Sequence, residues 1–103
     1  MKTIQFTDKK SIEVKFSFKV MQKLYVVSGI TEFQELAKWA NSPNNWGKLV
    51  QAVSVKEIKE SEAVAMIDEC NSVKPIVDII NEMAEHITAF YTIESKGENI
   101  PNG

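Results

Sequence analysis

The sequence has few of the residues that enzyme chemistry needs. Its 103 residues contain one cysteine, Cys70, one histidine, His86, and four glycines that form no phosphate-binding loop. A single cysteine cannot form an internal disulfide bond, so a reduced, cytoplasmic compartment is the simplest expectation. No apolar run approaches the roughly 18 residues of a membrane-spanning helix, and the first ten residues lack the apolar segment of a signal peptide. We therefore expect a cytoplasmic protein with no membrane partner.

Arginine is absent, and all twelve basic residues are lysines in a chain of net charge −2. Arginine is the residue that reads phosphates and guanine in bidentate fashion, so the composition argues against nucleic-acid binding. Residues 1–55 carry eight lysines and four acids, a balance of +4, whereas residues 56–103 carry four lysines and ten acids, a balance of −6. The asymmetry fits two solvated faces, or a head-to-tail contact between copies of the chain.

The scarce reactive residues form no recognisable catalytic or metal site. Glu82 and His86 are four apart on a predicted helix, but a metal-binding bundle needs a second matching set, so we expect an ion pair between them. Cys70 lies near the end of a predicted helix, where a thiolate is not stabilised, and is expected to be a small core residue. The sequence thus predicts no catalytic, cofactor-binding or metal-binding residue, and a protein that is not an enzyme.

The N-terminal residues have the pattern of a β-hairpin. Apolar and polar residues alternate over residues 2–7 and again over residues 11–16, with a short charged turn between the two segments. A lone hairpin is marginal in water, so its apolar face is expected to rest on helices.

Five helices are predicted after the hairpin, and each has a capping signal. The first spans residues 18–28, with Ser17 as N-cap and Gly29 as the left-handed residue after its end. The later ones are expected to begin at residues that suit an N-cap, namely Thr31, Ser42, Ser61 and Ser72. The last helix, about residues 73–93, carries apolar residues over an arc of roughly 160°, so it is expected to meet two neighbours.

These elements predict an α+β, mainly α, fold. An N-terminal β-hairpin packs on a bundle of about five helices, of which the last is long and amphipathic. Residues 1–94 are expected to form one domain, and the polar tail 95–103, with glycine and proline, to be disordered.

The helix at residues 18–28 is apolar around most of its circumference. Val26, however, shares a side with its polar residues, and no predicted element covers it. Trp39 and Trp46 flank the segment ANSPNN, where they either anchor the corner between two helices or form an aromatic hot spot for a partner. Phe90 and Tyr91 extend the wide apolar arc of the last helix. The predicted partner-binding residues are therefore Val26, Trp39, Trp46, Phe90 and Tyr91.

The order of these parts resembles the tail assembly chaperones of long-tailed (siphovirus-type) bacteriophages. The resemblance spans residues 4–93. It consists of a charged hairpin, the segment FSFKVMQKLYVVSGI, a tryptophan-bearing middle, LAKWANSPNNWGKLVQAV, the segment KEIKESEAVAMIDE and a long amphipathic helix. It implies a non-enzymatic cytoplasmic protein, absent from the mature virion, that binds the hydrophobic helical tape measure protein, keeps it soluble and helps recruit tail tube subunits. In many members a ribosomal frameshift adds a second domain, and the chain would then be the short form.

Two other hypotheses remain open at this stage. The chain could be a small cytoplasmic regulatory or inhibitor protein, of phage or bacterial origin, that binds one folded partner through the tryptophan corner or the edge of the hairpin. It could also be an enzyme or cofactor-binding domain, which its single histidine and lack of converging acids oppose. A homo-oligomer is compatible with the first hypothesis, because contacts between unlike surfaces build open assemblies.

Overall fold

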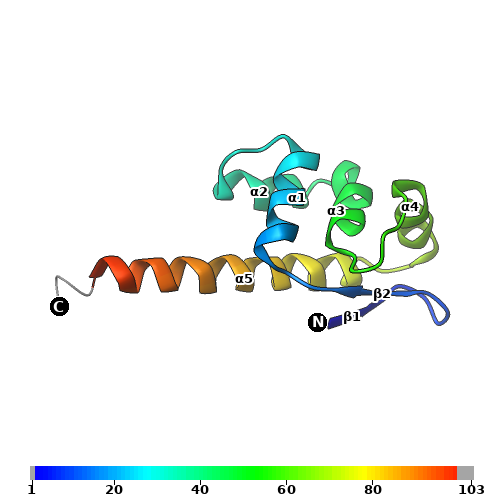
Figure 1. The fold of residues 1–103 in the computed structure, drawn as a ribbon. Helices are drawn as coiled ribbons and strands as arrows, with labels where there is room; N and C mark the ends of the chain where they lie inside the picture. The colour runs from blue at the N-terminus through cyan, green and yellow to red at the C-terminus, as the bar shows by residue number, and fades with distance from the viewer. Residues whose placement is uncertain (1, 100–103) are drawn as a thin grey trace.

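The structure is a computed structural model that describes residues 2–99, without the side chains of Phe33 and residues 89–99. Its elements are β1 (Lys2–Gln5), β2 (Ser11–Val14), α1 (Phe18–Ser28), α2 (Phe33–Ala40), the 3₁₀ turn η1 (Pro43–Asn45), α3 (Trp46–Val53), α4 (Glu60–Glu69) and α5 (Lys74–Asn99). Helix α5 runs along one side of the molecule, the shorter helices lie across it, and the hairpin lies beside its N-terminal half (Figure 1). The predicted mainly helical α+β fold is confirmed.

The hairpin forms as the alternation of its residues predicts. Strands β1 and β2 pair antiparallel, with Ile4 opposite Ile12, and both isoleucines are buried together with Val14. The turn is closed by Thr7, whose Oγ1 accepts hydrogen bonds from the backbone N–H groups of Lys9 and Lys10 at 3.2 and 3.0 Å. Because β1 packs against α5, the apolar face of the hairpin is covered by a helix, as a two-stranded sheet requires.

Helix α1 begins and ends at the predicted residues. The Ser17 hydroxyl accepts a hydrogen bond from the Val20 N–H at 3.3 Å, which satisfies one of the free donors of the first turn. Gly29 follows the helix with φ of 72° and donates its N–H to the Tyr25 carbonyl at 3.0 Å. Only glycine adopts this left-handed conformation without steric cost, so both helix ends are set by local sequence.

The predicted starts of α2 and α4 are wrong by one or two residues, and α5 begins at Lys74, one residue later than predicted. Helix α2 begins after Glu32 rather than after Thr31, and α4 begins after Lys59 rather than after Ser61. In neither case does a side chain bond to the first turn. A side-chain cap contributes only about 1 kcal/mol, so packing and the favourable acids in the first turn of α4 outweigh it. Pro43 does lie at the first position after Ser42, but it opens a 3₁₀ turn.

The core is centred on α3, which packs against α1, α4 and α5. Its inner residues Leu49, Val50 and Val53 are completely buried. Helix α5 adds Ile79 and Met83, which are also completely buried. The hairpin, the short helices and α5 thus share one continuous core.

The covered side of α5 is narrower than its apolar arc. Val73 and Val77 belong to the arc predicted from the sequence, yet they are exposed, and Ile80 is only half-buried. The helix also continues to Asn99, beyond the end predicted near residue 93. A single glycine within a helix costs only about 1 kcal/mol, so Gly97 does not stop it. Residues 100–103 of the predicted tail lie outside the described residues.

Gly47 lets α3 and α4 approach closely, and Gly47→Ala is expected to destabilise the protein. A Cβ atom at this position would lie 2.7 Å from Cγ2 of Val64 and 3.3 Å from Cγ of Glu60. Because valine is stiff about χ1, we expect a net loss of about 1–2 kcal/mol of unfolding free energy, overpacking being partly offset by helix propensity. Urea denaturation measures this loss.

The double variant Gly47→Ala/Val64→Ala isolates the cause. Removing the two methyl groups of Val64 makes room for the new Cβ, so the cost of Gly47→Ala should fall to about zero in the Val64→Ala background. An unchanged cost in that background would contradict the close-approach explanation.

Candidate protein-binding surface

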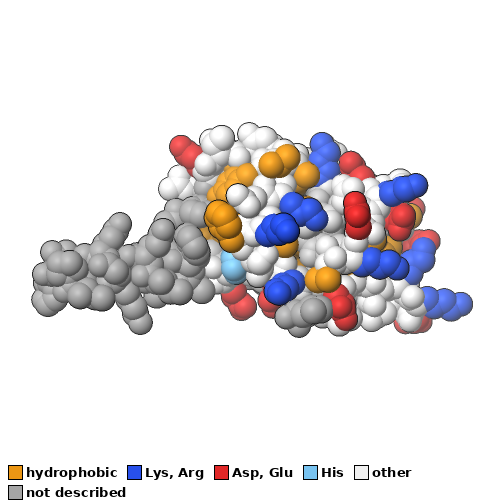
Figure 2. Space-filling view, viewed as in Figure 1, with side chains coloured by type: hydrophobic (Ala, Val, Ile, Leu, Met, Phe, Trp, Pro, Cys, Tyr) orange, Lys and Arg blue, Asp and Glu red, His pale blue; other side chains and the backbone are white. Residues whose placement is uncertain are grey.

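Helix α1 exposes a mixed apolar and basic surface, which we call the α1 face. It comprises Phe18, Lys19, Gln22, Lys23 and Val26, all of which are exposed. Phe18 and Val26 are 68% and 81% exposed, the two highest values among the exposed large hydrophobic residues of the described part. The spacing Phe18, Gln22, Val26 is i, i+4, i+8, which aligns the three side chains in one row along the helix. Figure 2 shows apolar and lysine side chains side by side over α1.

The α1 face is exposed because the opposite side of the helix provides the anchoring. Met21 and Leu24 are buried in the core, and Leu24 is completely inaccessible. Val20 and Val27 are half-buried and pack at the margin of the same core. The neighbours of α1 are α3 and α2, which lie on this inner side. The fold therefore covers only part of a helix that is apolar around most of its circumference.

The charge on the α1 face has one sign. Helix α1 contains Lys19 and Lys23 and no acidic residue. Within the described residues, the ion pairs join other lysines to acids, namely Lys2 to Glu82, Lys10 to Glu69 and Lys74 to Asp78. Two lysines beside exposed apolar side chains form a surface that is complementary to an acidic, amphipathic partner.

The two predicted tryptophans lie at the corner between α2 and α3. The Trp46 indole is half-buried and donates its Nε1–H to the Ala40 carbonyl at 2.9 Å. Asn45 reinforces the corner by donating its Nδ2–H to the Trp39 carbonyl at 3.0 Å. Both indoles pack against the core. The first interpretation, that tryptophans anchor the corner, thus accounts for Trp46, while a role of either indole in partner binding stays a prediction.

The other predicted binding residues fall in different parts of the molecule. Val26 lies on the α1 face. Phe90 and Tyr91 belong to the C-terminal part of α5, and their side chains lie outside the described residues, so their prediction stays untested. The sequence interpretation did not single out Phe18, which is 68% exposed. Its i+8 spacing from Val26 is the signal that could have placed both on one side.

The scarce reactive residues are occupied by structural contacts. The predicted ion pair between Glu82 and His86 is not observed in the described residues. Glu82 instead accepts a hydrogen bond from the Lys2 ammonium at 2.8 Å. This hydrogen bond and the charge of Glu82 raise the pKa of Lys2. The His86 ring lies 6.1 Å from the Phe16 ring, and the half-buried Cys70 thiol donates to the Ser72 carbonyl at 3.2 Å. The described residues contain no cluster of three potential metal ligands.

Comparison with known proteins gives no relative from which a function could be taken. No protein-family model, curated protein or solved structure matches the chain. In the part that the structure describes, every helix is too short or too polar to cross a bilayer. The α1 face is therefore the feature on which a functional proposal can be built.

Proposed function

We propose that the protein is a non-enzymatic phage tail assembly chaperone that binds helical, hydrophobic segments of a tape measure protein and keeps them soluble. The observation that carries the proposal is the α1 face, where Phe18 and Val26 are 68% and 81% exposed on a helix that carries lysines and no acid. A chaperone for an amphipathic helix needs such an apolar surface on an otherwise polar domain. The α1 face supports the binding of an apolar helix, whereas the phage context, the tape measure protein as the partner and the recruitment of tail tube subunits rest on the family resemblance alone.

The geometry of the α1 face suits a helical partner. Phe18 and Val26 are two turns apart, which places them about 12 Å from one another along the axis. Apolar residues of a partner helix recur at the same spacing, so one partner helix lying along α1 can cover both. Lys19 and Lys23 then lie at the rim of the contact, where they can pair with acidic residues that border the apolar stripe of the partner.

The charge distribution along the chain supports assembly in several copies. Counting lysines and acids, residues 1–55 have a net charge of +4 and residues 56–103 a net charge of −6. Contacts between unlike surfaces of this kind generate open assemblies. Such an assembly would allow many copies to cover one long tape measure protein.

Val26→Asp is expected to abolish this activity without unfolding the protein. The side chain is 81% exposed, so the carboxylate remains in water. Because Val26 lies in the last turn of α1, the helix dipole opposes the new charge, and the unfolding free energy should fall by less than about 1 kcal/mol. In the complex the carboxylate would be buried against an apolar and acidic partner, which is unfavourable. The measurement is the soluble fraction of a co-expressed tape measure protein, together with the number of chaperone copies that co-purify with it.

Val73→Asp is the matched control. Val73 is 56% exposed and precedes α5, so the same substitution places the same charge at a helix N-terminus, where it is tolerated. It should leave the soluble fraction unchanged. A tape measure protein that stays insoluble with the unmodified chain contradicts the proposal. Recovery of one folded host protein at equal stoichiometry would favour the regulatory or inhibitor hypothesis instead.

A further inference from the structure

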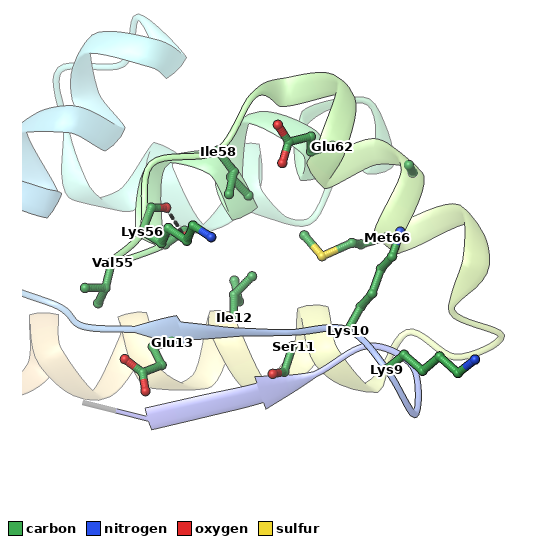
Figure 3. A pocket seen from close by; sticks show the side chains of 12 residues that line it. Lys9, Lys10, Ser11, Ile12, Glu13, Val55, Lys56, Ile58, Glu62 and Met66 are labelled. Atoms are coloured by element: carbon green, nitrogen blue, oxygen red, sulfur yellow. Dashed lines mark hydrogen bonds between the residues drawn. The ribbon is translucent and has the colours of Figure 1, made fainter.

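We propose that the outer edge of β2 is a second binding site, which accepts an extended segment of a partner polypeptide as an added antiparallel strand. A groove of about 580 Å³ lies along this edge. It is bounded by β2, by the connector between α3 and α4, and by α4 itself (Figure 3). The volume is in the range of sites that bind small ligands. The site is separate from the α1 face and does not depend on the proposed chaperone function.

Alternate residues of β2 direct their backbone groups away from β1. The Phe6 N–H donates to the Lys10 carbonyl at 2.9 Å, so the backbone of Lys10 faces β1. Residues two apart in an antiparallel strand direct their backbone groups to the same side. The backbone of Ile12 therefore faces β1. The N–H and C=O groups of Ser11 and Glu13 face the outer edge.

The connector covers only one end of this edge. Val55 donates its N–H to the Glu13 carbonyl at 2.8 Å, next to an isolated antiparallel bridge between Val14 and Ser54. The pairing ends there, and within residues 2–99 no group outside the hairpin is hydrogen-bonded to the backbone of Ser11. An edge with free donors and acceptors is the feature that strand addition uses.

Two hydrogen bonds hold the connector away from the rest of the edge. The Ser54 hydroxyl donates to the Lys56 carbonyl at 2.6 Å, which turns the chain immediately after the bridge. The Gln51 side chain then donates to the Ile58 carbonyl at 3.1 Å, which fastens the connector to α3. The groove is therefore a preformed space between two fixed segments, and it lies where a continued antiparallel pairing would have run.

The side chains in the groove define which segment fits it. Ile12, Ile58 and Met66 point into its middle, while Lys56 and Lys10 flank this apolar part at its two ends (Figure 3). An added strand presents alternate side chains to the same face. A residue beside Ile12 should thus be apolar, and the residue two positions later, beside Lys10, should be acidic.

Lys10 is available to such a partner although it has an ion pair. Its ammonium lies 3.6 Å from the Glu69 carboxylate, and the two side chains are 49% and 51% exposed. An exposed pair at this distance contributes little, so a partner carboxylate can compete for the ammonium. Glu13 and Glu62 also line the groove, so the expected acid position is the one beside Lys10. The groove should therefore favour an extended segment in which an apolar residue is followed, two positions later, by an acid.

A titration with the capped tripeptide Val-Thr-Glu tests the proposal, because Val55 and Ser54 already occupy the positions opposite Glu13 and Val14. In nitrogen–proton correlation spectra of the full chain, the amide signal of Ser11 should shift on binding, and its hydrogen exchange should slow. Ser11→Pro removes the N–H that faces the groove but no bond to β1, since proline is tolerated at a strand edge. We expect it to weaken binding by roughly tenfold or more, a loss that corresponds to one hydrogen bond in a buried groove.

Matched controls separate strand addition from other modes of binding. Thr3→Pro makes the same change at the opposite edge of the hairpin, because Thr3 lies opposite Glu13 and also faces outward, and it should leave the affinity unchanged. Methylation of the amide of the threonine of the peptide, which lies opposite Ser11, should abolish binding, whereas methylation of the valine amide should not. These peptide variants test the proposal even if Ser11→Pro fails to fold.

Four results would overturn the proposal. They are no binding at millimolar peptide, equal losses from Ser11→Pro and Thr3→Pro, equal affinity for the peptide with lysine in place of glutamate, and binding of the peptide as a helix. A shift of the Ser11 amide that disappears only with the methylated threonine supports it.

Discussion

Ile79→Asp is expected to leave the chain unfolded at 25 °C. Ile79 lies on the inner side of α5 and is completely buried in the core. The substitution removes the burial of a large apolar side chain, about 1.5–3 kcal/mol, and places a carboxylate without a partner in an apolar environment, which costs several kcal/mol more. The sum approaches the total stability of a domain of this size, about 5–15 kcal/mol. Circular dichroism and urea denaturation measure the outcome.

Val77→Asp is the control for this prediction. Val77 lies two residues away on the same helix and is 45% exposed, so the same new charge can reach water. We expect its unfolding free energy to change by less than about 1 kcal/mol. If both variants unfolded, the exposed side of α5 would be covered in the folded protein, and the description of its apolar arc as half-exposed would be wrong.

Trp46→Ala is expected to lower the unfolding free energy by about 2–4 kcal/mol, somewhat less than for a completely buried tryptophan. The indole packs against the core at the start of α3 and donates to the Ala40 carbonyl at the end of α2. Its loss removes apolar contacts and the hydrogen bond that fixes the corner between the two helices. Thermal and urea denaturation measure the change.

Substitutions to phenylalanine separate the hydrogen bond from the packing. Trp46→Phe keeps most of the apolar contact but removes the Nε1–H, so it should cost about 1 kcal/mol more than the same change at Trp39. In the described part of the chain the Trp39 indole packs at the margin of the core, and no hydrogen bond of its Nε1–H is observed there. Equal costs at the two positions would show that the bond to Ala40 does not stabilise the corner.

The surface available to partners was only partly predictable from the sequence. Val26 could be predicted as exposed because it shares a side of α1 with three polar residues, and it is 81% exposed. The exposure of Phe18 had only a weak signal, its i+8 spacing from Val26, because a phenylalanine at the first position of a helix is equally compatible with a buried contact. Its exposure follows from where α3 and α2 meet α1, and that is a property of packing.

The groove beside β2 could be predicted only in part from the sequence. The alternation over residues 2–7 and 11–16 indicates a hairpin, whose edge was a candidate binding feature, but it does not indicate how much of the outer edge of β2 stays unpaired. That extent depends on the bridge between Val14 and Ser54, residues 40 positions apart, and on the bond from Gln51 that draws the connector away. Contacts of this separation have no signature in local composition.

The sequence by itself determined the elements whose interactions are local. The period of two in the hairpin, the Ser17 cap and the left-handed Gly29 each act within a few residues, so they have the same effect in any fold. Only the tertiary structure decided where α4 begins, which part of the apolar arc of α5 is covered and how much of the outer edge of β2 remains open. Each of these depends on the competition between distant segments for the same apolar surface, and that competition is settled by packing the whole chain into one core.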